Sequence, residues 1–110
     1  MLANEHERLF KSFSWEDHVL IRCVKKLVVT GFSGLKYIDL GFEQIYWLSL
    51  PKEARDLAKE VGAVKWRSDD VWCPVFEDEG DLVLWFVLAY RKGLIPKKII
   101  KSIKSIRWFI

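Results

Sequence analysis

The sequence predicts a single α+β domain over residues 1–110, in which a small, mainly antiparallel sheet of four to five strands is packed by three helices. Three observations support this fold class. Short β-branched and aromatic runs alternate with Gly-containing turns, which is typical of hairpins. Two segments repeat their apolar residues with the period of an amphipathic helix, and a third is apolar on almost every side. The length and the 51% hydrophobic content suffice for one buried core.

The first predicted element begins at Ser14, which forms a capping box with Asp17, because a hydroxyl at the N-cap is followed three residues later by an acid. A helix from Trp15 to about Lys25 places four residues along one flank: Trp15, Val19, Leu20 and Cys23. The β-branched run Val19–Ile21 is also typical of a strand. Of the two alternatives we predict the helix.

Three strands are predicted next, at Lys26–Thr30, Leu35–Leu40 and Gln44–Leu50. The turns between them, 31–34 and 41–43, contain glycine and are short enough for antiparallel hairpins. In the third strand neither alternating face is clearly polar. We therefore expect that strand to be central in the sheet and covered on both sides.

Residues 48–75 form a predicted strand–helix–hairpin unit. Pro51 suits the first turn of a helix, because it has no backbone N–H to leave unpaired and its φ is already close to the helical value. A buried stripe is expected on this helix, made of Ala54, Leu57, Ala58 and Val61. Gly62 ends it, since glycine takes a left-handed cap without steric cost.

Two short strands, Val64–Arg67 and Val71–Cys73, are predicted to follow that helix as a hairpin around a polar turn. Alternation along the strands places Trp66 and Trp72 on the same face, where we expect them to pair.

The stretch from Leu48 to Val75 resembles a small domain that accompanies primases and other DNA-processing proteins of plasmids and phages. The pattern of that domain is a strand ending in Pro, a helix rich in Lys, Glu and Ala, Leu-Gly-Ala-Lys/Arg-Trp-Asp, a polar turn and Trp-Tyr-x-Pro. The spacings from Pro51 to Ala63 and from Ala63 to Trp72 agree with it. This chain has one extra residue before the first Trp, Arg67 in place of Asp, and one residue fewer before the final Pro. The HARP module of annealing helicases is similar in outline. The resemblance covers about a quarter of the chain and implies an accessory module that faces nucleic acid rather than a catalyst.

Asp81 is predicted to cap a helix over Leu82–Lys92 that ends at Gly93. This helix has almost no polar face, so it is either the central pillar of the core or half of an interface. Pro96 begins the last helix, Lys97–Ile110, whose isoleucines share one face. Its opposite, basic face is either solvated, or binds phosphate, or lies on a membrane surface. Leu82–Tyr90 and the isoleucine stripe of Ile99–Ile110 are the expected contacts of a homodimer or a protein partner.

Basic residues are concentrated toward the C-terminus, because residues 82–110 hold seven Lys or Arg and no Asp or Glu, whereas residues 1–81 hold fifteen acids and eleven bases. This asymmetry predicts an anionic partner, and DNA or RNA is the partner that we prefer. We expect backbone and shape recognition, with Trp or Tyr stacking on unpaired bases. The candidate phosphate-contacting residues are Lys52, Arg55, Lys59, Lys65, Arg67, Lys97, Lys101, Lys104 and Arg107.

The sequence carries no recognisable catalytic motif: it has no His-Glu-x-x-His, no phosphate loop with Gly-Lys-Ser/Thr and no dinucleotide fingerprint. We therefore expect a protein that is not an enzyme and has no catalytic residue, cofactor or metal site. Two alternatives remain: a protein–protein adaptor or inhibitor acting through an apolar helix face, and a metal-dependent nuclease using the acidic residues around 77–81.

Cys23 and Cys73 are too few and too far apart for a metal motif, and we expect two buried thiols rather than a disulfide. The charged N-terminal residues do not match a signal peptide. The longest apolar run, Leu82–Tyr90, is shorter than the ~20 residues that a membrane-spanning helix needs. We expect a cytoplasmic protein without a transmembrane segment.

Overall fold

The computed structural model describes residues 8, 11–39, 50–67 and 73–106, and the structural statements below concern these residues. In chain order the elements are α2 (Trp15–Lys25), β1 (Val28–Thr30), the 3₁₀ turn η1 (Phe32–Gly34), β2 (Lys36–Ile38), α3 (Lys52–Val61), β3 (Lys65–Arg67), β4 (Cys73–Val75), α4 (Glu79–Arg91) and α5 (Lys97–Ile106).

The predicted sheet of four to five strands packed by three helices is wrong. Within the described ranges four helices form most of the fold, and the strands pair into two separate antiparallel hairpins, β1–β2 and β3–β4. Each strand is three residues long, and a single antiparallel bridge between Lys36 and Phe76 links the hairpins. Strands this short bury little side-chain area, so they cannot organise the core.

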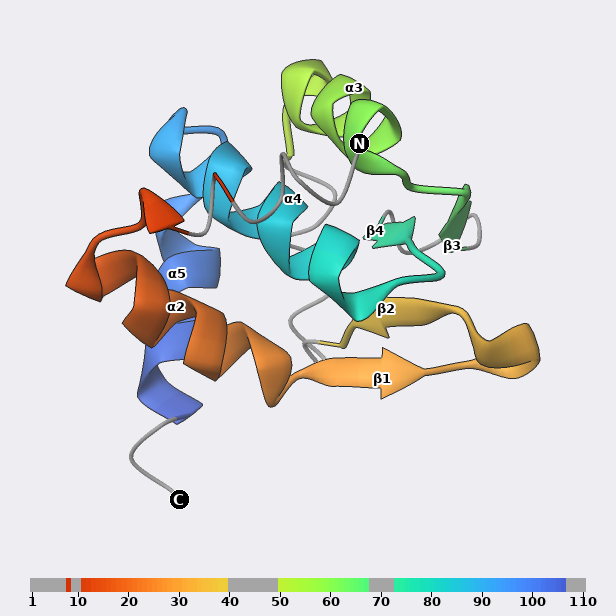
Figure 1. The fold of residues 1–110 in the computed structure, drawn as a ribbon, viewed down its shortest axis with the longest axis horizontal. Coiled ribbons are helices and arrows are strands. Elements are labelled where there is room, and N and C mark those ends of the chain that lie inside the picture. Colours follow the sequence, from red (N-terminus) through yellow and green to blue (C-terminus); the bar gives the residue numbers. More distant parts are fainter. Residues whose placement is uncertain (1–7, 9–10, 40–49, 68–72, 107–110) are drawn as a thin grey trace.

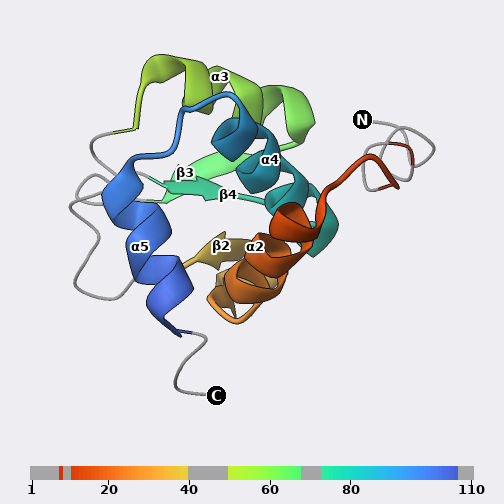
Figure 2. The same cartoon turned by 90° about the vertical axis from the view of Figure 1, so that its left-hand side faces the viewer.

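Helix α4 takes the central place instead. It lies between α3 and α2, with the two hairpins near its N-terminal end and α5 packed against α2 (Figures 1 and 2). Its side chains from Leu82 to Val87, and Ala89, are buried on all sides of the helix. This burial accounts for the absence of a polar face, and it favours the core pillar over an interface. Ile99 and Ile103 of α5 are also fully buried, as the amphipathic pattern predicts.

Helix α2 confirms the predicted capping box. The Ser14 hydroxyl accepts from the Asp17 backbone N–H at 3.3 Å, and the Asp17 carboxylate accepts from the Ser14 N–H at 2.9 Å. The helix ends at Lys25, as expected. One part of the prediction is wrong, because Trp15 is 75% exposed and does not belong to the buried flank. Around an α-helix Trp15 lies about 140° from Leu20, which is buried.

A charged contact joins the start of α2 to the end of α4. The Asp17 side chain, 6% exposed, lies 3.3 Å from the guanidinium of Arg91. Arg91 also donates to the Ser12 carbonyl at 3.4 Å and lies 5.2 Å from the centre of the Phe13 ring. Because Asp17 accepts from Ser14 as well, this buried carboxylate has both a charged and a backbone partner.

Helix α3 follows its prediction closely. Pro51 is its N-cap, and all four residues of the expected stripe are buried: Ala54, Leu57, Ala58 and Val61. Gly62 ends the helix at φ 134°, with its N–H bonded to the Ala58 carbonyl. Helix α4 departs from its prediction, because Asp78 rather than Asp81 is its N-cap and accepts from the Gly80 N–H at 2.6 Å.

The hairpin after α3 is present, with Cys73–Val75 as its second strand, and of the predicted strand Val71–Cys73 only Cys73 is among the described residues. The register pairs Trp66 with Pro74. Trp72, and with it the predicted tryptophan pair, lies outside the described residues. Of the predicted strand Gln44–Leu50 only Leu50 is described; it is buried and belongs to no strand. The pairing of β1 with β2 confirms the first predicted hairpin, in shortened form.

The end of α3 provides a stability test. Replacing Gly62 by alanine is expected to lower the free energy of unfolding by about 1–3 kcal/mol, because alanine rarely adopts this φ. The added Cβ also meets the Asp81 carboxylate at 3.0 Å. Gly93→Ala is the matched control, since Gly93 has φ 73° and open space around it, so its loss is expected to be smaller. Urea unfolding followed by circular dichroism measures both, and equal losses would contradict the role of crowding at Gly62.

Candidate nucleic-acid interface

The bases predicted on the Pro51 helix form one stripe of α3. Lys52, Arg55 and Lys59 are all exposed, away from the buried side. An acidic stripe runs beside them, made of Glu53, Asp56 and Glu60. At 3.6 residues per turn the centres of the two stripes are about 100° apart around the helix. The acids and bases that alternate in the sequence therefore form two adjacent stripes on the helix surface.

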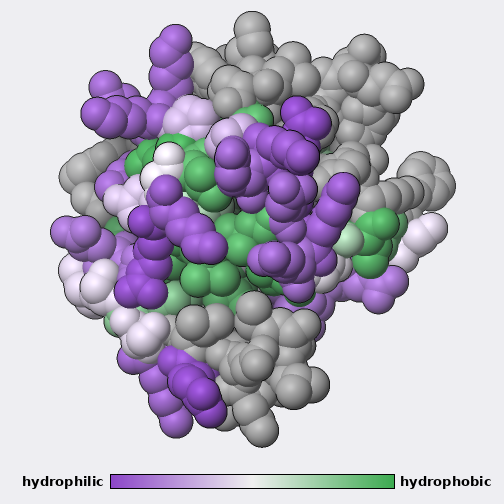
Figure 3. Space-filling model, turned by 90° about the horizontal axis from the view of Figure 1, so that it is seen from above, coloured by the Kyte–Doolittle hydropathy of each residue, from purple (hydrophilic) through white to green (hydrophobic). Residues whose placement is uncertain are grey.

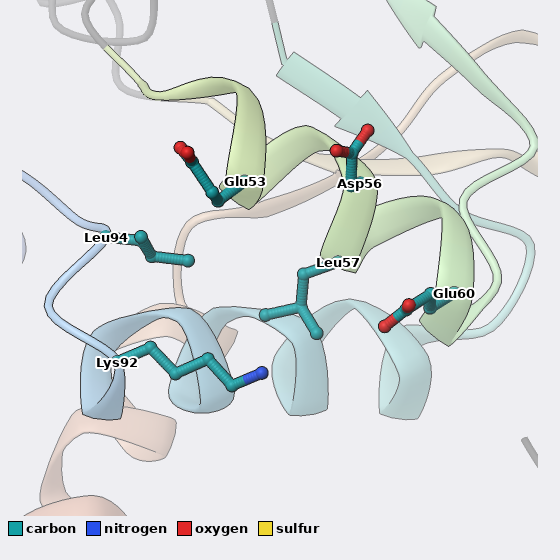
Figure 4. A pocket seen from close by; sticks show the side chains of 6 residues that line it. All are labelled: Glu53, Asp56, Leu57, Glu60, Lys92 and Leu94. Atoms are coloured by element: carbon teal, nitrogen blue, oxygen red, sulfur yellow. The ribbon is translucent and has the colours of Figure 1, made fainter.

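The acidic stripe borders a groove of about 350 Å³ between α3 and the end of α4. Besides the three acids it is lined by Leu57, Lys92 and Leu94. Leu57 and the Lys92 side chain point into the space between the helices, and the Glu60 carboxylate points the same way (Figure 4). Seen from above, apolar atoms lie between hydrophilic side chains on this face of the molecule (Figure 3). The groove carries an acidic rim and is not suited to phosphate.

The acidic stripe weakens α3 as an anion-binding surface. A helix with its side chains is ~10–12 Å wide, and charges are screened over ~8 Å at physiological salt. The three acids and three bases of α3 therefore lie within about one screening length of each other. A phosphate chain near Lys52 or Lys59 meets a nearly neutral helix rather than a basic one.

The predicted bases of β3, Lys65 and Arg67, lie two residues apart in a strand and so on one side of it, opposite Val75 and Cys73 in the register. The side chains of these two residues are not described. Arg107 lies outside the described residues.

The tail lysines are arranged as predicted on α5. Lys97, Lys101 and Lys104 are exposed, on the side of the helix opposite Ile99 and Ile103. Helix α5 packs against α2, whereas α3 packs against α4 (Figure 2). The structure therefore does not assemble the α3 and α5 bases into one packed helix pair.

The neighbour that α5 does have also carries exposed bases, which the sequence analysis missed. Trp15, His18, Arg22 and Lys25 are exposed and follow one outward stripe of α2, opposite the buried Leu20 and Val24. The signal was present in the helical spacing, because residues three, seven and ten positions apart share a face. Grouping Trp15 with the apolar residues concealed it.

We name the α2–α5 basic face by its five residues: Arg22, Lys25, Lys97, Lys101 and Lys104. Across the described part of the chain none of the five has an ion-pair partner. Helix α5 has no acid, and α2 has acids only in its first turn, Glu16 and Asp17. Asp17 is buried and paired with Arg91, so Glu16 is the one exposed acid of these two helices.

Other chemistries receive less support from the geometry. The described part of the chain holds no cluster of three His, Cys, Asp or Glu residues that could bind a metal ion. Asp78 of the acidic loop serves as a helix cap. Cys23 and Cys73 are buried free thiols. Among the described residues, most apolar side chains of α4 and α5 lie in the protein's own core, which leaves little of the described part of either proposed protein-contact surface exposed.

No described helix combines the length and apolarity required to cross a bilayer. No family model matches the chain, and no similarity was found to a curated protein or to a solved structure.

Proposed function

We propose that this protein is a non-catalytic nucleic-acid-binding accessory protein that contacts the phosphate backbone through the α2–α5 basic face. One observation carries the proposal: five bases without ion-pair partners among the described residues lie on the outer faces of two helices that pack together. A row of cations with no interleaved carboxylates is the arrangement that releases counterions from a polyanion. The resemblance of residues 48–75 to a primase-associated domain agrees with this class of function and stays a prediction.

The charge of this face sets the expected salt dependence. Each phosphate neutralised contributes about −0.9 to the slope of log K against log salt for B-DNA. Five contacts predict a slope near −4.5, so affinity is expected to fall roughly 500-fold between 50 and 200 mM salt. Recognition of this kind fixes position on the backbone without reading sequence.

Reversing the charge of Lys97, Lys101 and Lys104 to glutamate is expected to flatten this slope by about 2.7, because three phosphate contacts are lost. Fluorescence anisotropy with labelled oligonucleotides over a salt series measures the slope. The matched control reverses Lys52, Lys59 and Lys92, which are equally exposed and change the net charge by the same amount elsewhere on the surface.

The control variant is expected to keep most of the slope. An equal loss in both variants would show that the net charge of the protein, rather than the α2–α5 basic face, determines binding. A loss in the control variant alone would move the binding surface to α3, where the sequence alone places part of it. Absence of measurable affinity at low salt for every single- and double-stranded oligonucleotide would remove the proposed function.

A further inference from the structure

Trp15 is 75% exposed, in contrast to Trp85, which is completely buried. Trp15 is the first residue of α2 and takes no part in the buried side of that helix. A large indole left in water forgoes the burial that usually stabilises a domain of this size. The contacts proposed between the basic residues and the phosphate backbone give this exposed indole no role.

Trp15 stands at one end of a row of bases. Arg22 is seven residues further along the same outward stripe, about 10 Å along the helix axis, and Lys25 follows after one more turn. The first turn around Trp15 is acidic, with Glu16 exposed beside it. A phosphate chain is therefore drawn toward Arg22 and Lys25, and the part of a nucleotide that can occupy the space over Trp15 is the uncharged base.

We infer that Trp15 stacks on an unpaired base, so that the ligand of the α2–α5 basic face is single-stranded nucleic acid. This inference rests on the proposed function and names its substrate class. The faces of bases in a duplex are covered by their neighbours, whereas an unpaired base offers a face to an aromatic ring. Basic side chains that contact only phosphates bind single- and double-stranded nucleic acid alike. An aromatic ring that stacks on an unpaired base adds affinity for the single strand alone.

A membrane surface is the competing anionic partner for a tryptophan beside cations. Interfacial helices bind by laying a broad apolar face into the headgroup region. The apolar face of α2 is instead buried in the core through Leu20, Ile21 and Val24. On the exposed side of α2 the apolar residues are Trp15 and the half-buried Val19. These two residues do not make a broad apolar face. The geometry favours the unpaired base.

The test compares Trp15→Ala and Trp15→Phe in the full chain, using oligo(dT) and a duplex of equal length. Trp15→Ala is expected to weaken binding to oligo(dT) roughly 5- to 150-fold, the usual range for one stacked base, with little change for the duplex. Trp15→Phe is expected to recover most of the loss, because it keeps an aromatic face. Quenching of protein fluorescence by oligo(dT) is expected in the wild type and reduced in Trp15→Phe.

The outcomes separate this inference from the function on which it rests. Unchanged oligo(dT) affinity in Trp15→Ala, with binding still lost on reversal of Lys97, Lys101 and Lys104, overturns stacking and leaves backbone binding intact. An equal loss for oligo(dT) and duplex also overturns it. Binding to vesicles of anionic lipid that Trp15→Ala abolishes, with no oligonucleotide binding, overturns both proposals. Circular dichroism confirms that each variant is folded.

Discussion

Replacing Trp85 by alanine is expected to lower the free energy of unfolding by about 3–5 kcal/mol, the range for truncating a buried aromatic side chain. Domains of this size are stable by ~5–15 kcal/mol in total, so the variant is expected to be marginal or unfolded at physiological temperature. Trp85 is completely buried in the central helix, and its indole N–H donates to the Ala54 carbonyl of α3 at 2.9 Å.

The rings around Trp85 explain why the effect is large. Its ring centre lies 6.1 Å from that of Phe76 and 5.9 Å from that of Phe86, the latter edge-on. Removing the indole thus opens a cavity where α3, α4 and the end of the second hairpin meet. Trp85→Phe keeps a ring and loses the hydrogen bond, and we expect an intermediate loss.

Urea unfolding followed by circular dichroism at 222 nm measures these losses without depending on tryptophan emission. Trp15→Ala is the matched control, because it removes the same side chain from an exposed site and is expected to change stability by less than about 0.5 kcal/mol. A loss at Trp85 no larger than that at Trp15 would contradict the central place of this side chain.

Replacing Asp17 by alanine is expected to destabilise the protein by about 2–3 kcal/mol. Two effects combine: the buried carboxylate loses its contact with Arg91 at 3.3 Å, and the Ser14 N–H loses its acceptor in the capping box. The loss stays below that of a fully buried ion pair, because Arg91 is 39% exposed and regains water.

Glu16→Ala is the control for Asp17→Ala, since Glu16 lies in the same acidic first turn but is exposed. We expect it to change stability by no more than about 0.5 kcal/mol. Amide hydrogen exchange adds a local readout, because loss of the cap is expected to increase exchange in the first turn of α2 beyond the global change. Equal effects of the two substitutions would show that burial and the Arg91 contact add nothing.

Local signals in the sequence predicted the helices well. The capping box at Ser14 located the start of α2, and Pro51 and Gly62 bracketed α3 with its four buried residues. At α4 the predicted cap, Asp81, was wrong, because the carboxylate of Asp78 reaches the Gly80 N–H and Asp78 is the N-cap. The sheet was mispredicted because apolar segments were assumed to pair with one another. The apolar side chains of α4 provide the surface against which other segments pack.

The candidate site shows the same limit. Helical period assigned the lysines of α5 to its outer face, and the structure places Lys97, Lys101 and Lys104 there. The periodicity of apolar residues does not predict which helices pack together, because that depends on how the buried faces of different helices fit one another. The packing of α5 against α2 rather than α3 therefore had to come from the structure.

The position of α4 in the chain has a consequence for biosynthesis. The element against which α2 and α3 pack is made after both of them, since it spans Glu79–Arg91. While the nascent polypeptide is shorter than this, the apolar stripes of the two earlier helices have no native surface to cover them. Such intermediates attract chaperones and associate with one another. The core of this domain is thus completed only after Glu79–Arg91 has been made, when this segment docks the two earlier helices together.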